Sequence, residues 1–110
     1  MMSEFVMTVF GSKDCKPCQG LKEDVEQLRH LIDIEFRYMD IDGDSKEVAE
    51  TMSEEDRAVF EKLSKEYGAD GVPMIHIKTD CGETTHRGYG SVERIIAMLD
   101  DVKCGRERSG

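Results

Sequence analysis

The sequence contains no apolar run that approaches ~20 residues, the length needed to cross a bilayer. Its first residues, Met1-Met2-Ser3-Glu4, contain no basic segment and no apolar core of the kind found in signal peptides. We therefore expect a cytoplasmic protein with no membrane partner. The chain also lacks internal repeats and linkers. Its 110 residues predict one domain, with a core over about residues 5–102 and a polar tail at 103–110.

Basic residues are few compared with acidic ones. The chain has 15 Lys and Arg against 24 Asp and Glu, which gives a formal net charge of −9. Phosphate backbones would be repelled by this charge, so nucleic acid is not an expected partner. Charged residues make up 35% of the chain, and we expect a well-solvated monomer whose acidic surface serves mainly solubility.

Because thiols are kept reduced in the cytoplasm, the four cysteines do not predict a framework of structural disulfides. A catalytic dithiol or a metal site is the expected use, and Cys15-Lys16-Pro17-Cys18 has the spacing for either. Zinc would need a second close pair of ligands, which the chain lacks. We expect Cys81 and Cys104 at the opposite end of the molecule, where they could lie near each other, as free thiols without a part in the reaction.

Apolar periodicity predicts a mixed series of strands and helices. The strand before Cys15 ends at the same end of the molecule at which the strand after Pro73 begins. The segment from Asp42 to Gly71 must leave that end and return, which favours two helices over one long one. The expected strands are 5–10, 34–41, 72–78 and 83–87, and the near-continuous apolarity of the first predicts burial on both faces. The expected helices are 19–32 with Pro17 in the first turn, 45–52, 54–67 and 92–102. Ser53 is the expected cap of the helix 54–67, Gly68 its expected end, and Ser91 the expected cap of the last helix.

The dithiol is expected at the first turn of a helix, where free N–H groups and the positive end of the dipole favour a thiolate. Cys15 would be exposed at the helix start, and Cys18 would lie one turn inside. Lys13 and Lys16 add positive potential, which Asp14 partly offsets. We expect the pKa of the Cys15 thiol to fall below its usual value of about 8.5.

The order of elements, the C-x-x-C motif and Gly71-Val72-Pro73 together resemble the thioredoxin/glutaredoxin superfamily. The stretch Thr8–Cys15 resembles the opening of glutaredoxins, which begins directly at the strand before the active site. The stretch Tyr67–Ile77 resembles the thioredoxin segment around its cis-proline. The resemblance implies an α/β thioredoxin-like fold, with a four-stranded mixed sheet in the order β-α-β-α-β-β-α flanked by helices.

The resemblance also implies a thiol–disulfide oxidoreductase that reduces protein disulfides, similar to small glutaredoxin-like proteins of which some reduce ribonucleotide reductase. Cys15 would attack the substrate and Cys18 would resolve the mixed disulfide. No cofactor is expected to be bound, and electrons would come from thioredoxin reductase with NADPH or from glutathione. A cis Val72–Pro73 bond would turn the backbone toward the dithiol. The implied substrate-binding residues are Lys16, Pro17, Val72, Pro73, Gly88 and Tyr89.

The sequence departs from both families at several positions. Asp14 stands where thioredoxins usually have tryptophan, and Val9 stands where they tend to carry a buried acid. The segment from Gly88 to Glu93 lacks the aspartate pair that glutaredoxins tend to use for glutathione, so glutathione dependence is the alternative rather than the main interpretation. A zinc-binding module and a redox-inactive interaction domain are the two further alternatives.

Overall fold

The computed structural model describes residues 4–41, 52–68 and 72–104. The expected helix at 45–52 and most of the expected polar tail lie outside these residues. Within the described part, no helix has the length and apolarity of a membrane span. The observed elements are β1 (Phe5–Gly11), α1 (Lys16–Leu28), β2 (Ile34–Asp40), α3 (Glu54–Tyr67), β3 (Met74–Thr79), β4 (Gly82–Arg87) and α4 (Val92–Val102).

The four strands form one mixed sheet in the order β2-β1-β3-β4, which confirms the predicted fold class. β1 runs parallel to β2 and antiparallel to β3, and β3 runs antiparallel to β4. The near-continuous apolarity of β1 predicted burial on both faces, and all but one of its residues are buried. The sheet therefore places its most apolar strand in the centre.

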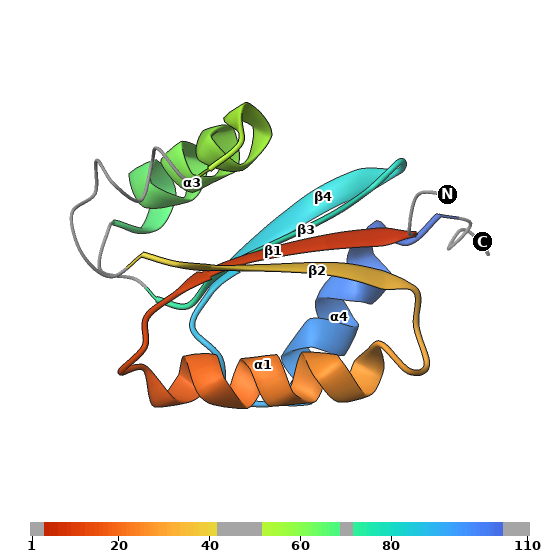
Figure 1. The fold of residues 1–110 in the computed structure, drawn as a ribbon. Helices are drawn as coiled ribbons and strands as arrows, with labels where there is room; N and C mark the ends of the chain where they lie inside the picture. Colours follow the sequence, from red (N-terminus) through yellow and green to blue (C-terminus); the bar gives the residue numbers. More distant parts are fainter. Residues whose placement is uncertain (1–3, 42–51, 69–71, 105–110) are drawn as a thin grey trace.

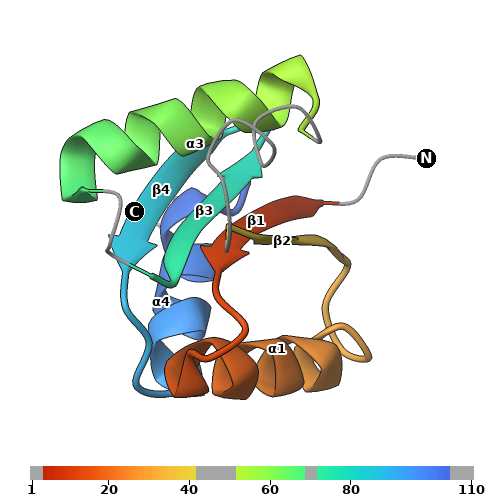
Figure 2. The same cartoon turned by 60° about the vertical axis from the view of Figure 1, so that its left-hand side comes forward.

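Helices cover both faces of the sheet (Figure 1). α1 and α4 lie against one face, and α3 lies on the other; the rotated view agrees (Figure 2). Side chains of a strand alternate between faces, so β1 supplies Met7 and Val9 to the α1 face and Phe10 to the α3 face. The sheet consequently separates two hydrophobic clusters.

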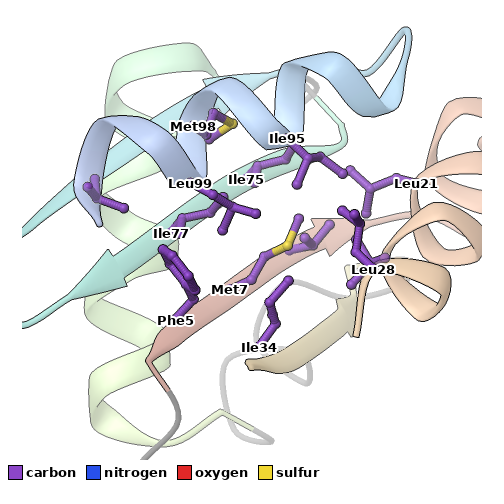
Figure 3. Packing of buried hydrophobic residues seen from close by; sticks show 13 residues of the cluster. Phe5, Met7, Leu21, Leu28, Ile34, Ile75, Ile77, Ile95, Met98 and Leu99 are labelled. Atoms are coloured by element: carbon purple, nitrogen blue, oxygen red, sulfur yellow. The ribbon is translucent and has the colours of Figure 1, made fainter. Parts of the chain in front are cut away.

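The larger cluster lies between the sheet and the helices α1 and α4. In Figure 3 the labelled side chains of the strands and of the two helices point toward one another. Met7, Val9 and Ile95 have no exposed surface. The smaller cluster consists of Phe10, Met52, Leu63 and Met74, with the Phe10 and Phe60 rings 5.1 Å apart between centroids. Among the described residues, the cluster on the α1 side of the sheet thus has more buried members.

Local signals set most helix ends. Ser53 accepts a hydrogen bond from the Asp56 N–H at 3.1 Å, which confirms the predicted cap of α3. Gly68, with φ 85°, ends that helix as predicted. Ser91 occupies the N-cap position of α4, although its side chain makes no capping hydrogen bond.

Several boundaries differ from the prediction, and for two of them the physical cause is plain. α1 ends at Leu28 rather than Ile32, and a turn follows. Ile32 still packs against the larger cluster, and its N–H donates to the Leu28 carbonyl oxygen at 2.8 Å, so its apolar spacing extended the helical pattern beyond the helix. β3 begins at Met74 rather than Val72, because Pro73 has no N–H with which to join a strand ladder.

Candidate functional site

Cys15 and Cys18 form a disulfide at the N-terminus of α1, with Cα atoms 5.2 Å apart. Cys15 is the N-cap residue, and its Sγ accepts a hydrogen bond from the Cys18 N–H at 3.2 Å. This contact satisfies one of the N–H groups that a helix leaves free at its start. Pro17 lies in the first turn, where a missing N–H costs nothing. The sequence therefore builds the helix start that was predicted for the dithiol.

The two sulfurs differ in accessibility. Cys15 is partly exposed, whereas Cys18 has no exposed surface. Lys16 and Pro17 are exposed between them. The first turn of α1 contains no acidic residue, so no carboxylate there opposes the positive end of the helix dipole. An incoming reactant can thus approach the Cys15 sulfur, while the Cys18 sulfur faces the protein interior.

The strand register brings the other predicted residues to the same end of the sheet. Phe10 pairs with Met74, and Met74 pairs with Arg87. Pro73 and Gly88, each the next residue beyond these pairs, therefore lie at the end of the sheet where β1 leads to Cys15. The Val72–Pro73 peptide bond is cis, which agrees with the expectation. The Gly88 N–H donates to the Pro73 carbonyl oxygen at 2.8 Å and ties the two segments together.

The segment between β4 and α4 runs down to α1 (Figures 1 and 2). There the Tyr89 hydroxyl donates a short hydrogen bond to the Asp24 carboxylate on α1. Burial, reinforced by this bond, raises the pKa of Tyr89, so its hydroxyl stays protonated as a donor. Gly88 has φ 89°, a conformation that glycine adopts without strain. Gly88 and Tyr89 are thereby fixed between Pro73 and the helix that carries the dithiol.

The structure thus gathers seven of the eight predicted site residues around one end of the sheet and the first turn of α1, and it places Tyr89 against α1. Pro73 is buried and Val72 is half-buried. Gly71, the first residue of the predicted Gly-Val-Pro motif, lies outside the described residues. The full set consists of Cys15, Lys16, Pro17, Cys18, Val72, Pro73, Gly88 and Tyr89.

Cys81 and Cys104 are bonded to each other, with Cα atoms 5.4 Å apart. The expectation of two free thiols is wrong, although their predicted position opposite the dithiol is correct. Cys81 lies in the turn between β3 and β4, and Cys104 follows the end of α4. The Thr79 hydroxyl donates to the Val102 carbonyl oxygen and accepts from the Cys81 N–H, which holds the turn beside the helix end. Topology indicated this proximity, but the expected reducing compartment argued against a bond.

Two residues that were not predicted lie against predicted site residues: Asp24 bonds to Tyr89, and Tyr38 lies with Cys18 beside Gly11. The sequence indicates only a polar helix face at Asp24 and only a strand position at Tyr38. Neither belongs to a motif, and only the packing of β2 and of the segment after β4 against α1 reveals them. Among residues 4–41, 52–68 and 72–104, no cluster of three or more His, Cys, Asp or Glu side chains could hold a metal ion.

Comparison with known proteins points to one family. A model of the thioredoxin-like domain matches residues 2–103. No curated protein sequence matches the chain. Among solved structures, a mutant thioredoxin from Halobacterium salinarum is similar, with 20% identity and a TM-score of 0.62, over 98% of this chain and 80% of that one.

Two other thioredoxins are also similar in fold. Chloroplastic thioredoxin z has 16% identity and a TM-score of 0.62, over 91% of this chain and 79% of that one. Thioredoxin f2 of Chlamydomonas reinhardtii has 15% identity and a TM-score of 0.58, over 98% of this chain and 85% of that one. Since the family model spans nearly the whole sequence, the chain belongs to the thioredoxin-like domain family, and it carries the cysteine pair of a thiol–disulfide oxidoreductase.

Proposed function

We propose that the protein reduces disulfide bonds in protein substrates through Cys15 and Cys18. The observation that supports this most is the unequal exposure of the two cysteines at the start of one helix. In the reduced protein, the Cys15 thiolate attacks a substrate disulfide and forms a mixed disulfide. Cys18 then attacks the Cys15 sulfur, which releases the reduced substrate and leaves the Cys15–Cys18 bond.

The substrate would dock beside the dithiol against residues that the structure holds at that end. Val72 precedes the cis bond and offers backbone groups to an extended substrate segment, a mode of binding that relies on main-chain hydrogen bonds. Lys16 and Pro17 are exposed next to Cys15, Gly88 is tied to Pro73, and Tyr89 follows Gly88 against α1. A site of this kind suits an exposed loop of a folded protein, and ribonucleotide reductase is one candidate substrate.

The electron donor is proposed to be thioredoxin reductase with NADPH, with glutathione as the alternative. The protein needs no bound cofactor for this cycle, because the electrons reside in the two thiols. A reducing cytoplasmic setting and a monomeric state are consistent with the proposal. The donor is tested by supplying the oxidised protein with either system and following the return of free thiols.

The role of each cysteine is tested by Cys18→Ser. With a disulfide substrate, this variant should accumulate a covalent adduct on Cys15, which intact-mass measurement and peptide mapping detect. Cys104→Ser is the matched control, because it also removes one sulfur but lies at the other end, and it should not trap substrate through Cys15. Absence of an adduct in Cys18→Ser would contradict the assignment. Failure of the wild type to reduce insulin would favour a redox-inactive domain.

A further inference from the structure

A small space beside Gly11, at the end of β1, brings two reactive side chains together. A Cβ atom at Gly11 would collide with the Tyr38 side chain, whose Cζ would lie at 2.8 Å and whose hydroxyl would lie closer still. The same Cβ would lie 3.0 Å from the Cys18 Sγ. Because glycine has no side chain, the Tyr38 hydroxyl and the Cys18 sulfur can occupy the same neighbourhood over its backbone.

Three elements hold this arrangement in place. The register of β1 and β2 pairs Val9 with Tyr38, so the tyrosine projects toward the face that α1 covers. Cys18 and Lys22 lie one turn apart on α1 and therefore on the same side of that helix. The Lys22 Nζ is 4.4 Å from the centroid of the Tyr38 ring, a favourable position for a cation over an aromatic face.

The chemistry proposed above requires a charged sulfur in this neighbourhood. Cys18 must become a thiolate to attack Cys15, yet its side chain is fully buried, and burial disfavours the charged form. The Cys18 N–H is directed at the Cys15 sulfur and not at its own. Val9, fully buried on β1 beside Tyr38, has no polar side-chain atom to offer. A phenol hydroxyl is a hydrogen-bond donor, and a hydrogen bond to a thiolate favours that charged form.

We propose that the Tyr38 hydroxyl donates a hydrogen bond to the Cys18 thiolate while Cys18 resolves the mixed disulfide. The inference rests on the proposed disulfide reductase function. Cys18 loses its proton to solvent and attacks the Cys15 sulfur, and the new bond forms as the bond from Cys15 to the substrate sulfur breaks. The departing substrate thiolate takes up a proton, and the dithiol gives up two electrons in all. Tyr38 keeps its proton throughout, and Lys22 adds positive potential on the same side.

The two chemical steps can be observed separately with 5,5′-dithiobis(2-nitrobenzoate), an aromatic disulfide whose released thiolate is coloured. In a stopped-flow experiment with the reduced protein, the first release reports attack by Cys15 and the second reports resolution by Cys18. In Tyr38→Phe, the first release should stay within about twofold of wild type, whereas the second should slow roughly tenfold, as expected for the loss of a hydrogen bond to a charged sulfur.

Tyr67→Phe is the matched control, because it removes a tyrosine hydroxyl that lies 3.0 Å from Thr85 Oγ1 rather than beside Cys18. In this variant, the ratio of the second release rate to the first should remain close to that of the wild type. Gly11→Ala should reproduce the slow second release, since the added methyl group displaces the Tyr38 hydroxyl. If Gly11→Ala does not fold, Tyr38→Phe alone decides.

An unchanged second release in Tyr38→Phe, or an equal slowing of both releases, would overturn the role of Tyr38. Absence of the first release in the wild type would instead overturn the proposed function, so the two failures are distinguishable. Thermal unfolding of each variant, followed by circular dichroism, shows whether a slow step accompanies a general loss of structure. A selective slowing of the second release in a variant with wild-type unfolding supports the proposal.

Discussion

The two disulfides of this protein have almost the same span and entirely different surroundings. The Cα atoms are 5.2 Å apart in Cys15–Cys18 and 5.4 Å apart in Cys81–Cys104. The first pair is three residues apart in the sequence, caps a helix N-terminus and has one buried sulfur. The second pair is 23 residues apart, joins a hairpin turn to the residues after a helix C-terminus, and both its cysteines are exposed.

The Cα–Cα distance does not distinguish the two pairs. They differ in sequence separation and in the helix end that they adjoin, and these differences suit them to different roles. Free N–H groups at a helix start favour a thiolate, so the Cys15–Cys18 pair suits repeated opening and closing. A bond that closes a longer loop removes more freedom from the unfolded chain. The Cys81–Cys104 bond, when it is formed, therefore suits a stabilising link between the sheet and α4.

The largest expected effect is on activity. Cys15→Ser should reduce the rate of insulin reduction to the uncatalysed level, because it removes the attacking sulfur. The double variant Cys81→Ser/Cys104→Ser should retain activity within about twofold, since its sulfurs lie at the other end of the sheet. Insulin turbidity in the presence of dithiothreitol measures both. Equal losses in the two variants would remove the functional distinction between the pairs.

The effects on the free energy of unfolding should have the opposite order, with the larger loss for the Cys81–Cys104 pair. Without reductant, Cys81→Ser/Cys104→Ser should lower the free energy of unfolding by about 3 kcal/mol, as expected for closure of a loop of this length. Cys15→Ser/Cys18→Ser should cost less, because its loop is much shorter. Urea unfolding of the oxidised proteins provides the comparison. A larger loss for the Cys15–Cys18 variant would show that the first turn of α1 stabilises the fold more than the far link does.

A smaller effect is expected from Tyr89→Phe, which acts at the active-site end. Loss of its hydrogen bond to Asp24 should lower the free energy of unfolding by about 1–2 kcal/mol. The KM for a protein substrate should also rise a few-fold, because Gly88 and Tyr89 are less firmly held beside the dithiol. Tyr67→Phe is the matched control. It removes a hydroxyl 3.0 Å from Thr85 Oγ1, and it should leave KM unchanged.

The smallest effect concerns Glu83 on β4, in the hairpin that carries Cys81. Glu83 accepts hydrogen bonds from Lys62 and His76, whose nitrogen atoms are each 2.9 Å from the same carboxylate oxygen. These bonds, the one from Lys62 most strongly, lower the pKa of Glu83 to about 2. A carboxyl group with a depressed pKa stabilises the fold above its unfolded value of about 4.3 and loses that contribution as the pH falls toward 2. Since Glu83 is almost half exposed, we expect less than about 1 kcal/mol.

The Glu83 contribution is measured by urea unfolding of the wild type and Glu83→Gln at pH 6 and at pH 2.5. The two proteins should differ at the higher pH and converge at the lower one. A constant difference across this range would mean that the amide costs stability for a reason other than charge. Cys81→Ser/Cys104→Ser in the same background would show whether the link and the ion pairs stabilise the hairpin independently.

Much of the fold was predictable because its signals are local. The apolar run of β1, the Ser53 cap and the Gly68 terminator each act within a few residues, and each was identified correctly. The position of the dithiol at a helix start also followed from its neighbours. The predicted end of α1 lies too far along the chain. Ile32 continues the apolar spacing of the helix, but it packs against the larger cluster from the turn that follows the helix.

The remaining features depend on contacts between distant segments. Tyr89 bonds to Asp24 across 65 residues, and the Tyr38 side chain and the Cys18 sulfur both lie in space that the absence of a side chain at Gly11 leaves open. The Cys81–Cys104 bond was missed for another reason. The topology predicted the right end of the molecule, but the expected cellular compartment outweighed it.

The division of the interior by the sheet has a consequence for engineering this protein. Among the described residues, the two clusters have no member in common and lie on opposite faces of the sheet. Substitutions on the two sides, such as Leu21→Ala and Leu63→Ala, should therefore have additive effects on unfolding, within about 0.5 kcal/mol. The α3 side could be redesigned for solubility or for attachment to a carrier, while the packing behind the redox pair remains as it is.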